Sequence, residues 1–246
     1  MAFFSNTQEL EEIKTLLSRY ARLPFSSTRM AIPGAIVEMI IAYVKKATVL
    51  NTYDFVDIVN QNQSYGWQVK STRESTPVTW KRAKIRHAPA LIKESKLRPQ
   101  GLQKLGDSII EFCNEHALQS LKRYNLNEMG YARLIIHPNN KATYFERRLC
   151  TRSEPLIFKA QDFEWHWSTP KKTTKKEQLP ALHGIRKTTG QKWWAWHGLG
   201  ENQLHFSGEK NWWLQPGDNH VVTFDLPTKM SIKAFIELLS QLDIPD

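Results

Sequence analysis

The chain places two β-prone runs, YDFVDIV (53–59) and YGWQVKST (65–72), on either side of the polar, turn-forming segment NQNQS (60–64). β-Branched and aromatic residues favour strands, and a short polar segment between two such runs is typical of a hairpin. We therefore expect two adjacent antiparallel strands. Gln68 and Lys70 are two residues apart, so they should project from one face of the second strand, where Asp57 could lie beside them.

Asp57, Gln68 and Lys70 provide a carboxylate, an amide oxygen and an ammonium group. Oxygen ligands suit a hard divalent cation such as Mg²⁺, and phosphodiester hydrolysis needs charge neutralisation at the phosphate together with an aligned nucleophile. The three residues therefore predict a metal-assisted phosphodiesterase site. Asp54, three residues before Asp57, is an alternative for the metal-binding acid.

Helical patterns precede these strands. Ser5 and Gln8 have the spacing of a capping box ahead of a helical apolar repeat, which should end before Pro24. A second helix should begin near Pro33, a favourable first-turn residue, and Glu38 lies at the edge of its apolar face.

The same alternation of helices and strands continues to residue 150. A third helix is expected over 102–124, and the turn at 138–140 should join the strands ARLIIH (132–137) and ATYFERRLC (142–150) in a hairpin. The resulting order predicts an α/β (α+β) fold, with a mixed β-sheet flanked by helices.

Short aromatic runs dominate the rest of the chain, which we expect to form a β-rich C-terminal subdomain ending in a helix. We therefore expect a core with N-terminal helices at 1–150 and the β-rich subdomain at 151–246. The alternative is that both parts form one continuous domain. Alternation favours core packing over base stacking for the tryptophans of this half. The expected strands are LIFKA (156–160), FEWHW (163–167), KWWAWH (192–197), QLHF (203–206) and VVTFDL (221–226), and the tryptophans are Trp193, Trp194, Trp196, Trp212 and Trp213.

The charge balance favours a polyanionic partner. Lysine and arginine number 34 against 24 acidic residues, a net charge of +10, which points to nucleic acid before a membrane surface. The longest apolar stretch, 32–44, is too short and too interrupted to span a bilayer. The chain has two cysteines, Cys113 and Cys150, which lie far apart in the sequence, so a reducing cytoplasm is the default location. The sequence contains no glycine-rich phosphate loop, so it gives no reason to expect a nucleotide cofactor.

Two one-sided basic segments are candidates for contact with DNA phosphates. The first follows the Gln68–Lys70 strand directly, and the second is a loop suited to clamping a duplex. The candidate residues are Lys81, Arg82, Lys84 and Arg86 in the first segment, and Lys171, Lys172, Lys175, Lys176, Arg186 and Lys187 in the second.

An acid on one strand, then Glu or Gln, any residue and Lys on the next, after a helix bearing Glu, resembles the PD-(D/E)xK nuclease core over about residues 30–150. Among proteins of this size, the resemblance points to type II restriction endonucleases. It implies a restriction-endonuclease-like fold, Mg²⁺-dependent hydrolysis of double-stranded DNA at a specific site, and a homodimer in a prokaryotic cytoplasm.

The resemblance also implies roles for individual residues. Asp57 and Gln68 would bind Mg²⁺ together with the Val69 carbonyl, and Lys70 would steady the attacking water. Gln68 stands where the family usually has an acid, so Glu38, or Glu74 just downstream, would compensate.

Two other functions stay open. A repair or junction-resolving nuclease of the same fold would share the motif but prefer mismatched or branched DNA. A non-catalytic nucleic-acid-binding protein would carry Gln68 as the mark of a decayed site.

Overall fold

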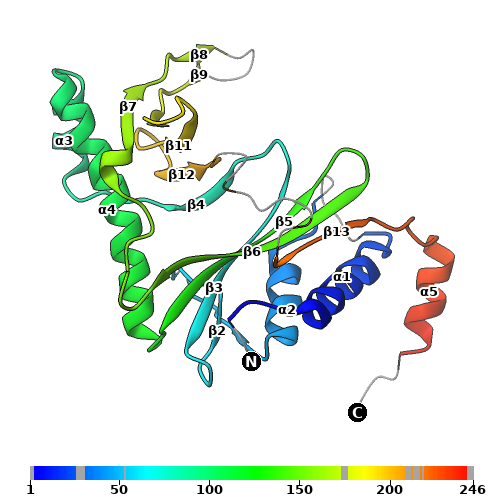
Figure 1. Ribbon diagram of the computed structural model, residues 1–246. Coiled ribbons are helices and arrows are strands. Elements are labelled where there is room, and N and C mark those ends of the chain that lie inside the picture. The colour runs from blue at the N-terminus through cyan, green and yellow to red at the C-terminus, as the bar shows by residue number, and fades with distance from the viewer. Residues whose placement is uncertain are drawn as a thin grey trace.

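The computed structural model describes residues 3–25, 31–52, 54–172, 177–208, 212, 217 and 219–242. Two large β-sheets, a two-stranded hairpin and five α-helices make up most of the described part, so the α+β class expected from the sequence is confirmed. Figure 1 shows one sheet beside helices α1 and α2, and the other beside the long helix α4. No helix among the described residues is long and apolar enough to cross a membrane.

The first sheet contains the strands that were expected around the candidate site. β2 and β3 pair antiparallel, with Ile58 opposite Trp67, and β5 and β6 form the expected hairpin; β3 and β5 are parallel. Both hairpins are therefore confirmed, although only Ile58 and Val59 of the expected run 53–59 lie in β2. The sheet order is β1 (Thr48–Val49), β2 (Ile58–Asn60), β3 (Tyr65–Arg73), β5 (Glu128–Ile136), β6 (Lys141–Thr151) and β13 (Val221–Asp225).

Helices cover both faces of this sheet. α1 (Thr7–Ala21) and α2 (Gly34–Val44) bury their apolar sides against one face, while α4 (Pro99–Arg123) belongs to the core on the other face. All three match helices expected from periodicity. The capping box of α1, however, is formed by Asn6 and Glu9, whose backbone N–H donates to Asn6 Oδ1 at 2.9 Å, so the expectation for Ser5 and Gln8 was wrong.

Ser5 is instead part of a buried network around Glu146. Its N–H and Oγ donate to the Glu146 carboxylate at 2.8 and 2.7 Å, and Tyr144 Oη donates at 2.8 Å. Lys45 Nζ lies 3.1 Å from Glu146 Oε1 and donates to the Phe3 carbonyl, and both charged side chains are at most 1% exposed. The ion pair therefore ties the start of the chain to α2 and β6.

The second sheet is entirely antiparallel. Its order is β4 (Val78–Arg82), β12 (Gln203–Phe206), β11 (Lys192–Trp196), β10 (Leu182–Arg186) and β7 (Phe163–Trp167). A small hairpin of β8 (Lys171–Lys172) and β9 (Glu177–Gln178) follows β7 in the chain. Figure 1 shows this hairpin at the top of the molecule, beyond the second sheet.

Each sheet contains strands from both sides of residue 150. β4 follows β3 directly in the chain but joins the second sheet, and β13 comes back to pair with β6 of the first. This interleaving favours one continuous domain, while the division at residue 150 stays a prediction. The remaining helices are α3 (Ala88–Ser95), in a segment where no element was expected, and α5 (Ile232–Ser240), the expected final helix.

The run LIFKA (156–160) is not a strand, contrary to the expectation. Its backbone is bound by one side chain of α4: Asn114 Oδ1 accepts the N–H groups of Ile157 and Phe158, and Asn114 Nδ2 donates to the Phe158 carbonyl at 2.8 Å. Because a side chain satisfies these backbone groups, the segment needs no partner strand. A short 3₁₀ turn, Ala160–Asp162, begins at its last residue.

Tryptophans fill the core between the second sheet and α4. Trp193, Trp194, Trp196 and Trp212 are all at most 8% exposed and belong to one apolar cluster, so their expected core role is confirmed. Trp213 lies outside the described residues. The core therefore fixes the second sheet on α4 and leaves its other face uncovered by this cluster.

Candidate active site

Asp57 and Lys70 meet at the end of the β2–β3 pairing. Asp57 comes directly before β2, and its N–H donates to the Trp67 carbonyl at 2.9 Å. Its Oδ2 accepts the Val69 N–H at 2.7 Å and lies 3.3 Å from Lys70 Nζ. The two side chains are 22% and 20% exposed, so a ligand can reach a partly dehydrated ion pair.

The backbone of Val69 contributes to the same place. Its N–H donates to the Asp57 carboxylate. In a longer β2 strand, a backbone carbonyl would have accepted this hydrogen bond. In an extended strand the N–H and C=O of one residue point to the same side. The Val69 carbonyl therefore also points to the Asp57 side of β3, while its role as a metal ligand stays a prediction.

Glu38 is close enough to Asp57 and Lys70 for their charges to affect its pKa. It is on α2 and is half-buried. Burial raises the pKa of Glu38, the negative charge of Asp57 raises it further, and the positive charge of Lys70 acts in the opposite direction. The structure thus brings Glu38, Asp57 and Lys70 into one neighbourhood.

Glu74, the other candidate for the compensating acid, is engaged elsewhere. Its Oε2 lies 3.2 Å from His137 Nδ1, and its N–H donates to the Ile136 carbonyl, beyond the end of β3 that is far from Asp57. Of the two acids, Glu38 is therefore the better candidate.

Asp54, the alternative to Asp57, is held by three side chains. Arg123 Nη1 donates to both carboxylate oxygens at 2.7 and 2.9 Å, and the hydroxyls of Tyr124 and Thr52 donate to Oδ2. Burial opposes ionisation, but the hydrogen bonds from Tyr124 and Arg123 outweigh it and lower the pKa of Asp54. Because its oxygens already have donors, Asp54 serves to fix the segment before β2 to α4, and Asp57 is the better candidate ligand.

Gln68 is buried next to the site with an amide oxygen that lacks a donor. Its side chain is 2% exposed, and Nε2 donates to the Trp80 carbonyl at 3.4 Å. Among the described residues no group donates to Oε1. A buried oxygen without a partner costs about 1–3 kcal/mol, so such an atom is suited to bind a ligand that supplies positive charge.

Lys81 lies near the candidate site, at an irregularity in the pairing of β4 with β12. On β4, Thr79 is opposite His205, and Lys81 is opposite Leu204, which directly precedes His205 in the chain. Trp80 is therefore an extra residue on β4 in this pairing. Such bulges turn a side chain away from strict alternation. Burial lowers the pKa of Lys81, and the charges of Asp54, Asp57 and Lys70 all act on its ammonium group. A second lysine therefore lies within electrostatic range of the candidate site.

The other predicted DNA contacts are spread over the surface. Arg82, Lys84, Arg86 and Lys187 are exposed, and Lys84 and Arg86 line a hollow of about 290 Å³ beside α4 together with Glu111 and Glu115. The Arg186 guanidinium lies 4.5 Å above the Trp193 ring. Lys171 and Lys172 form β8, whereas Lys175 and Lys176 lie outside the described residues.

The two cysteine thiols are poorer candidates for a reactive group than the Asp57–Lys70 pair. Burial raises the pKa of the Cys150 thiol to about 12 and that of Cys113 further, so neither is a ready thiolate. Within the described ranges, no group of three or more His, Cys, Asp and Glu side chains is arranged to hold a metal. A cation at the candidate site would therefore need amide and backbone oxygens beside the carboxylates of Asp57 and Glu38.

No family model matches the chain, and no curated protein matches it. The functional assignment consequently depends on the geometry around Asp57. The sequence located Asp57, Val69, Gln68 and Lys70 as neighbours, because adjacent strands bring them together. Lys81 was identified only as part of a basic run, since a bulge leaves no recognisable pattern in the sequence.

Proposed function

We propose that the protein is a Mg²⁺-dependent endonuclease of restriction type, which hydrolyses phosphodiester bonds of double-stranded DNA at a specific site. The observation that carries the proposal is the contact between Asp57 Oδ2 and Lys70 Nζ at 3.3 Å, partly exposed and with Glu38 close enough for its pKa to respond to both charges. A carboxylate, a second acid and an ammonium group at one accessible point are the groups that this hydrolysis requires.

The residues around Asp57 fit a hard divalent cation. Asp57, Glu38, the donor-less Oε1 of Gln68 and the Val69 carbonyl are all oxygen donors, the type that Mg²⁺ prefers. When bound, Mg²⁺ would neutralise charge on the phosphate and make a water molecule more acidic.

The chain's own groups would handle the substrate. Lys70, held by Asp57, would donate to the attacking water and keep it in line with the phosphorus atom. Lys81 would place a second positive charge toward the phosphate, where negative charge grows as the bond to the leaving oxygen breaks. A lysine ammonium group that is held in a partly dehydrated site stabilises negative charge more strongly than one in water.

Incubation of a supercoiled plasmid with the protein and Mg²⁺ tests the proposal. Discrete fragments support a restriction enzyme, whereas a smear or selective cutting of branched DNA would replace it by a nonspecific or a junction-type nuclease. Asp57→Asn should abolish cleavage, while Asp225→Asn, which changes an exposed acid at the end of β13, is the matched control and should retain it.

A non-catalytic DNA-binding protein is the second candidate. It is favoured by Gln68, a neutral residue whose amide nitrogen is bound to the Trp80 carbonyl. Tight duplex binding that Mg²⁺ does not change, with an intact plasmid in every divalent metal, would establish it in place of the nuclease. The homodimer and the cytoplasmic location belong to the restriction-type proposal.

A further inference from the structure

Histidines gather on the face of the second sheet that points away from the tryptophan core. His183 on β10 is directly opposite His166 on β7 and Ala195 on β11, and Ala195 is opposite His205 on β12. His197 is two residues after Ala195. The chain has 8 histidines, so half of them lie at or beside one row that crosses four neighbouring strands.

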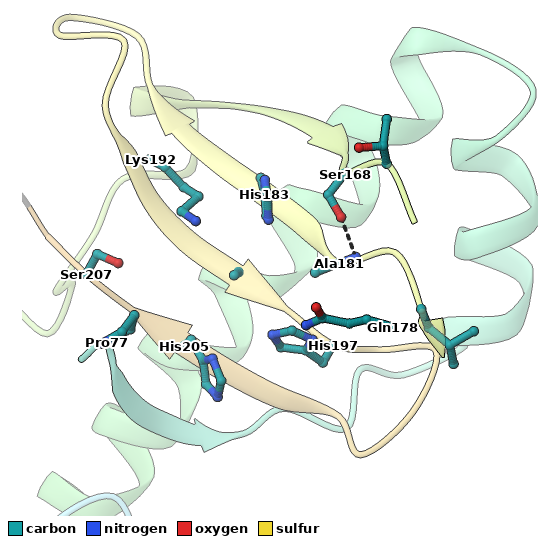
Figure 2. Close-up of a pocket in the computed structure, with 12 residues that line it drawn as sticks. Pro77, Ser168, Gln178, Ala181, His183, Lys192, His197, His205 and Ser207 are labelled. Carbon is teal, nitrogen blue, oxygen red and sulfur yellow. Dashed lines mark hydrogen bonds between the residues drawn. The ribbon is translucent and has the colours of Figure 1, made fainter. Parts of the chain in front are cut away.

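This face contains a hollow of about 210 Å³, lined by eight polar residues and by Pro77, Leu179, Ala181 and Ala195. Figure 2 shows His183, His197, His205 and Lys192 around it, with the His197 and His205 rings side by side. The centroids of these two rings are 4.8 Å apart, and those of His166 and His183 are 5.5 Å apart. No acidic side chain of the described residues lines the hollow.

A lysine-rich hairpin starts and ends at the rim of the hollow. Thr169 and Gln178 both line it. The segment between them holds Lys171, Lys172, Lys175 and Lys176 against the single acid Glu177. The two described ends of this segment therefore lie at the same face as the histidines.

We propose that the histidine face binds double-stranded DNA, with a backbone phosphate seated in the hollow between Lys192, His183 and His197. The choice of DNA as the ligand rests on the proposed function, whereas the phosphate chemistry follows from the charges of the face itself. Imidazole N–H groups and an ammonium group are donors that suit phosphate oxygens. The hollow lies on a different sheet from Asp57, so this phosphate contact is distinct from the candidate cutting site.

Protonation should regulate this contact. Burial lowers the pKa of His197 and of His205, and the positive charge of Lys192 adds to this effect in both. Glu201 opposes it at His197, His205 Nε2 shares a hydrogen-bonding contact with Gln203 Oε1 at 3.1 Å, and Glu164 lies two residues before His166 on β7. A bound phosphate favours the charged imidazoles, so affinity for DNA should rise as the pH falls through and below the ordinary histidine pKa of about 6.5.

Binding of a fluorescein-labelled DNA duplex, measured by anisotropy in a chelator so that no cleavage occurs, tests the inference. Lys192→Gln should reduce the slope of log affinity against log salt by about one unit. The double variant His183→Gln, His197→Gln should weaken binding by about tenfold and flatten the pH dependence. Lys141→Gln and His137→Gln, in the first sheet, are the matched controls and should bind as the wild type does.

Unchanged affinity and unchanged pH dependence in the face variants would overturn the inference, as would a wild-type protein that does not bind the duplex. Unfolding curves that coincide with the wild type exclude a trivial loss of fold. The plasmid assay with Mg²⁺ is independent of this outcome. Cleavage without any effect of the face variants on binding overturns only the histidine face, while binding through the face without cleavage in any divalent metal overturns only the nuclease.

Discussion

Lys70 Nζ lies 3.3 Å from Asp57 Oδ2, just before β2 begins and where β3 extends beyond the β2–β3 pairing. The same oxygen accepts the Val69 N–H at 2.7 Å, so both bonds hold one oxygen of the carboxylate, and no donor among the described residues reaches Oδ1. The arrangement fixes Asp57 while leaving an oxygen for a ligand.

Removal of either partner should separate catalysis from binding. Lys70→Ala should lower plasmid cleavage by about a hundredfold or more and leave DNA affinity nearly intact. Asp57→Ala should abolish cleavage and hold or tighten binding, because it removes an acid that repels the phosphate when no metal is present. Arg82→Ala, which changes an exposed residue, should instead lose affinity first. Wild-type cleavage rates in both Lys70→Ala and Asp57→Ala would show that the active site lies elsewhere.

Gln68→Glu should make stability depend on the metal. The new carboxylate would face the Trp80 carbonyl that now accepts the amide N–H, at a position only 2% exposed. Burial of that charge should lower the melting temperature in a chelator, and Mg²⁺ should raise it more than in the wild type. Cleavage should persist, with an altered preference among divalent metals. An equal Mg²⁺ effect in the two proteins would place Gln68 outside the metal site.

Glu38→Gln should trade activity for stability. Burial and the charge of Asp57 raise the pKa of Glu38 in the folded state above its ordinary value. The wild type therefore loses stability as the pH rises through the folded pKa, and Gln, which carries no charge, avoids that loss. Urea unfolding should show the variant to be more stable at neutral pH and equal to the wild type below the ordinary glutamate pKa, while cleavage falls. A variant that is less stable at neutral pH would contradict the prediction.

The buried ion pair of Lys45 and Glu146 should dominate the stability of the first sheet. Lys45→Met leaves the Glu146 charge buried without its cation and should cost about 3–5 kcal/mol of unfolding free energy. Lys14→Met, which breaks the exposed pair with Glu11, is the control and should cost less than about 1 kcal/mol. Denaturant unfolding measures both, and similar small losses would mean that the pair contributes little.

Salt should control association with DNA. Because the chain carries a net charge of +10, with basic side chains on exposed segments of both sheets, binding should release several counterions. Titration of a labelled duplex at increasing salt should give a steep negative slope of log affinity against log salt. A slope near zero would remove nucleic acid as the partner.

Local pattern was sufficient for the elements that carry the candidate site. The runs around 53–59 and 65–72 predicted the β2–β3 pairing, and Pro33 with the apolar repeat after it predicted α2. These features depend on residues close in the chain, whose spacing decides which faces become apolar. β4 and α3 were missed because they are only five and eight residues long, and the apolar residues of both are stabilised by packing in the core of the folded chain.

The sequence by itself determined that Asp57, Val69 and Lys70 would be neighbours, because antiparallel pairing of two consecutive strands permits little else. The tertiary structure decided which further groups join them. It engages Asp54 with Arg123 and Glu74 with His137, and it brings Glu38 and Lys81 toward Asp57. Those choices depend on how α2, α4 and the second sheet pack, and contacts between distant segments leave no periodic trace in a single sequence.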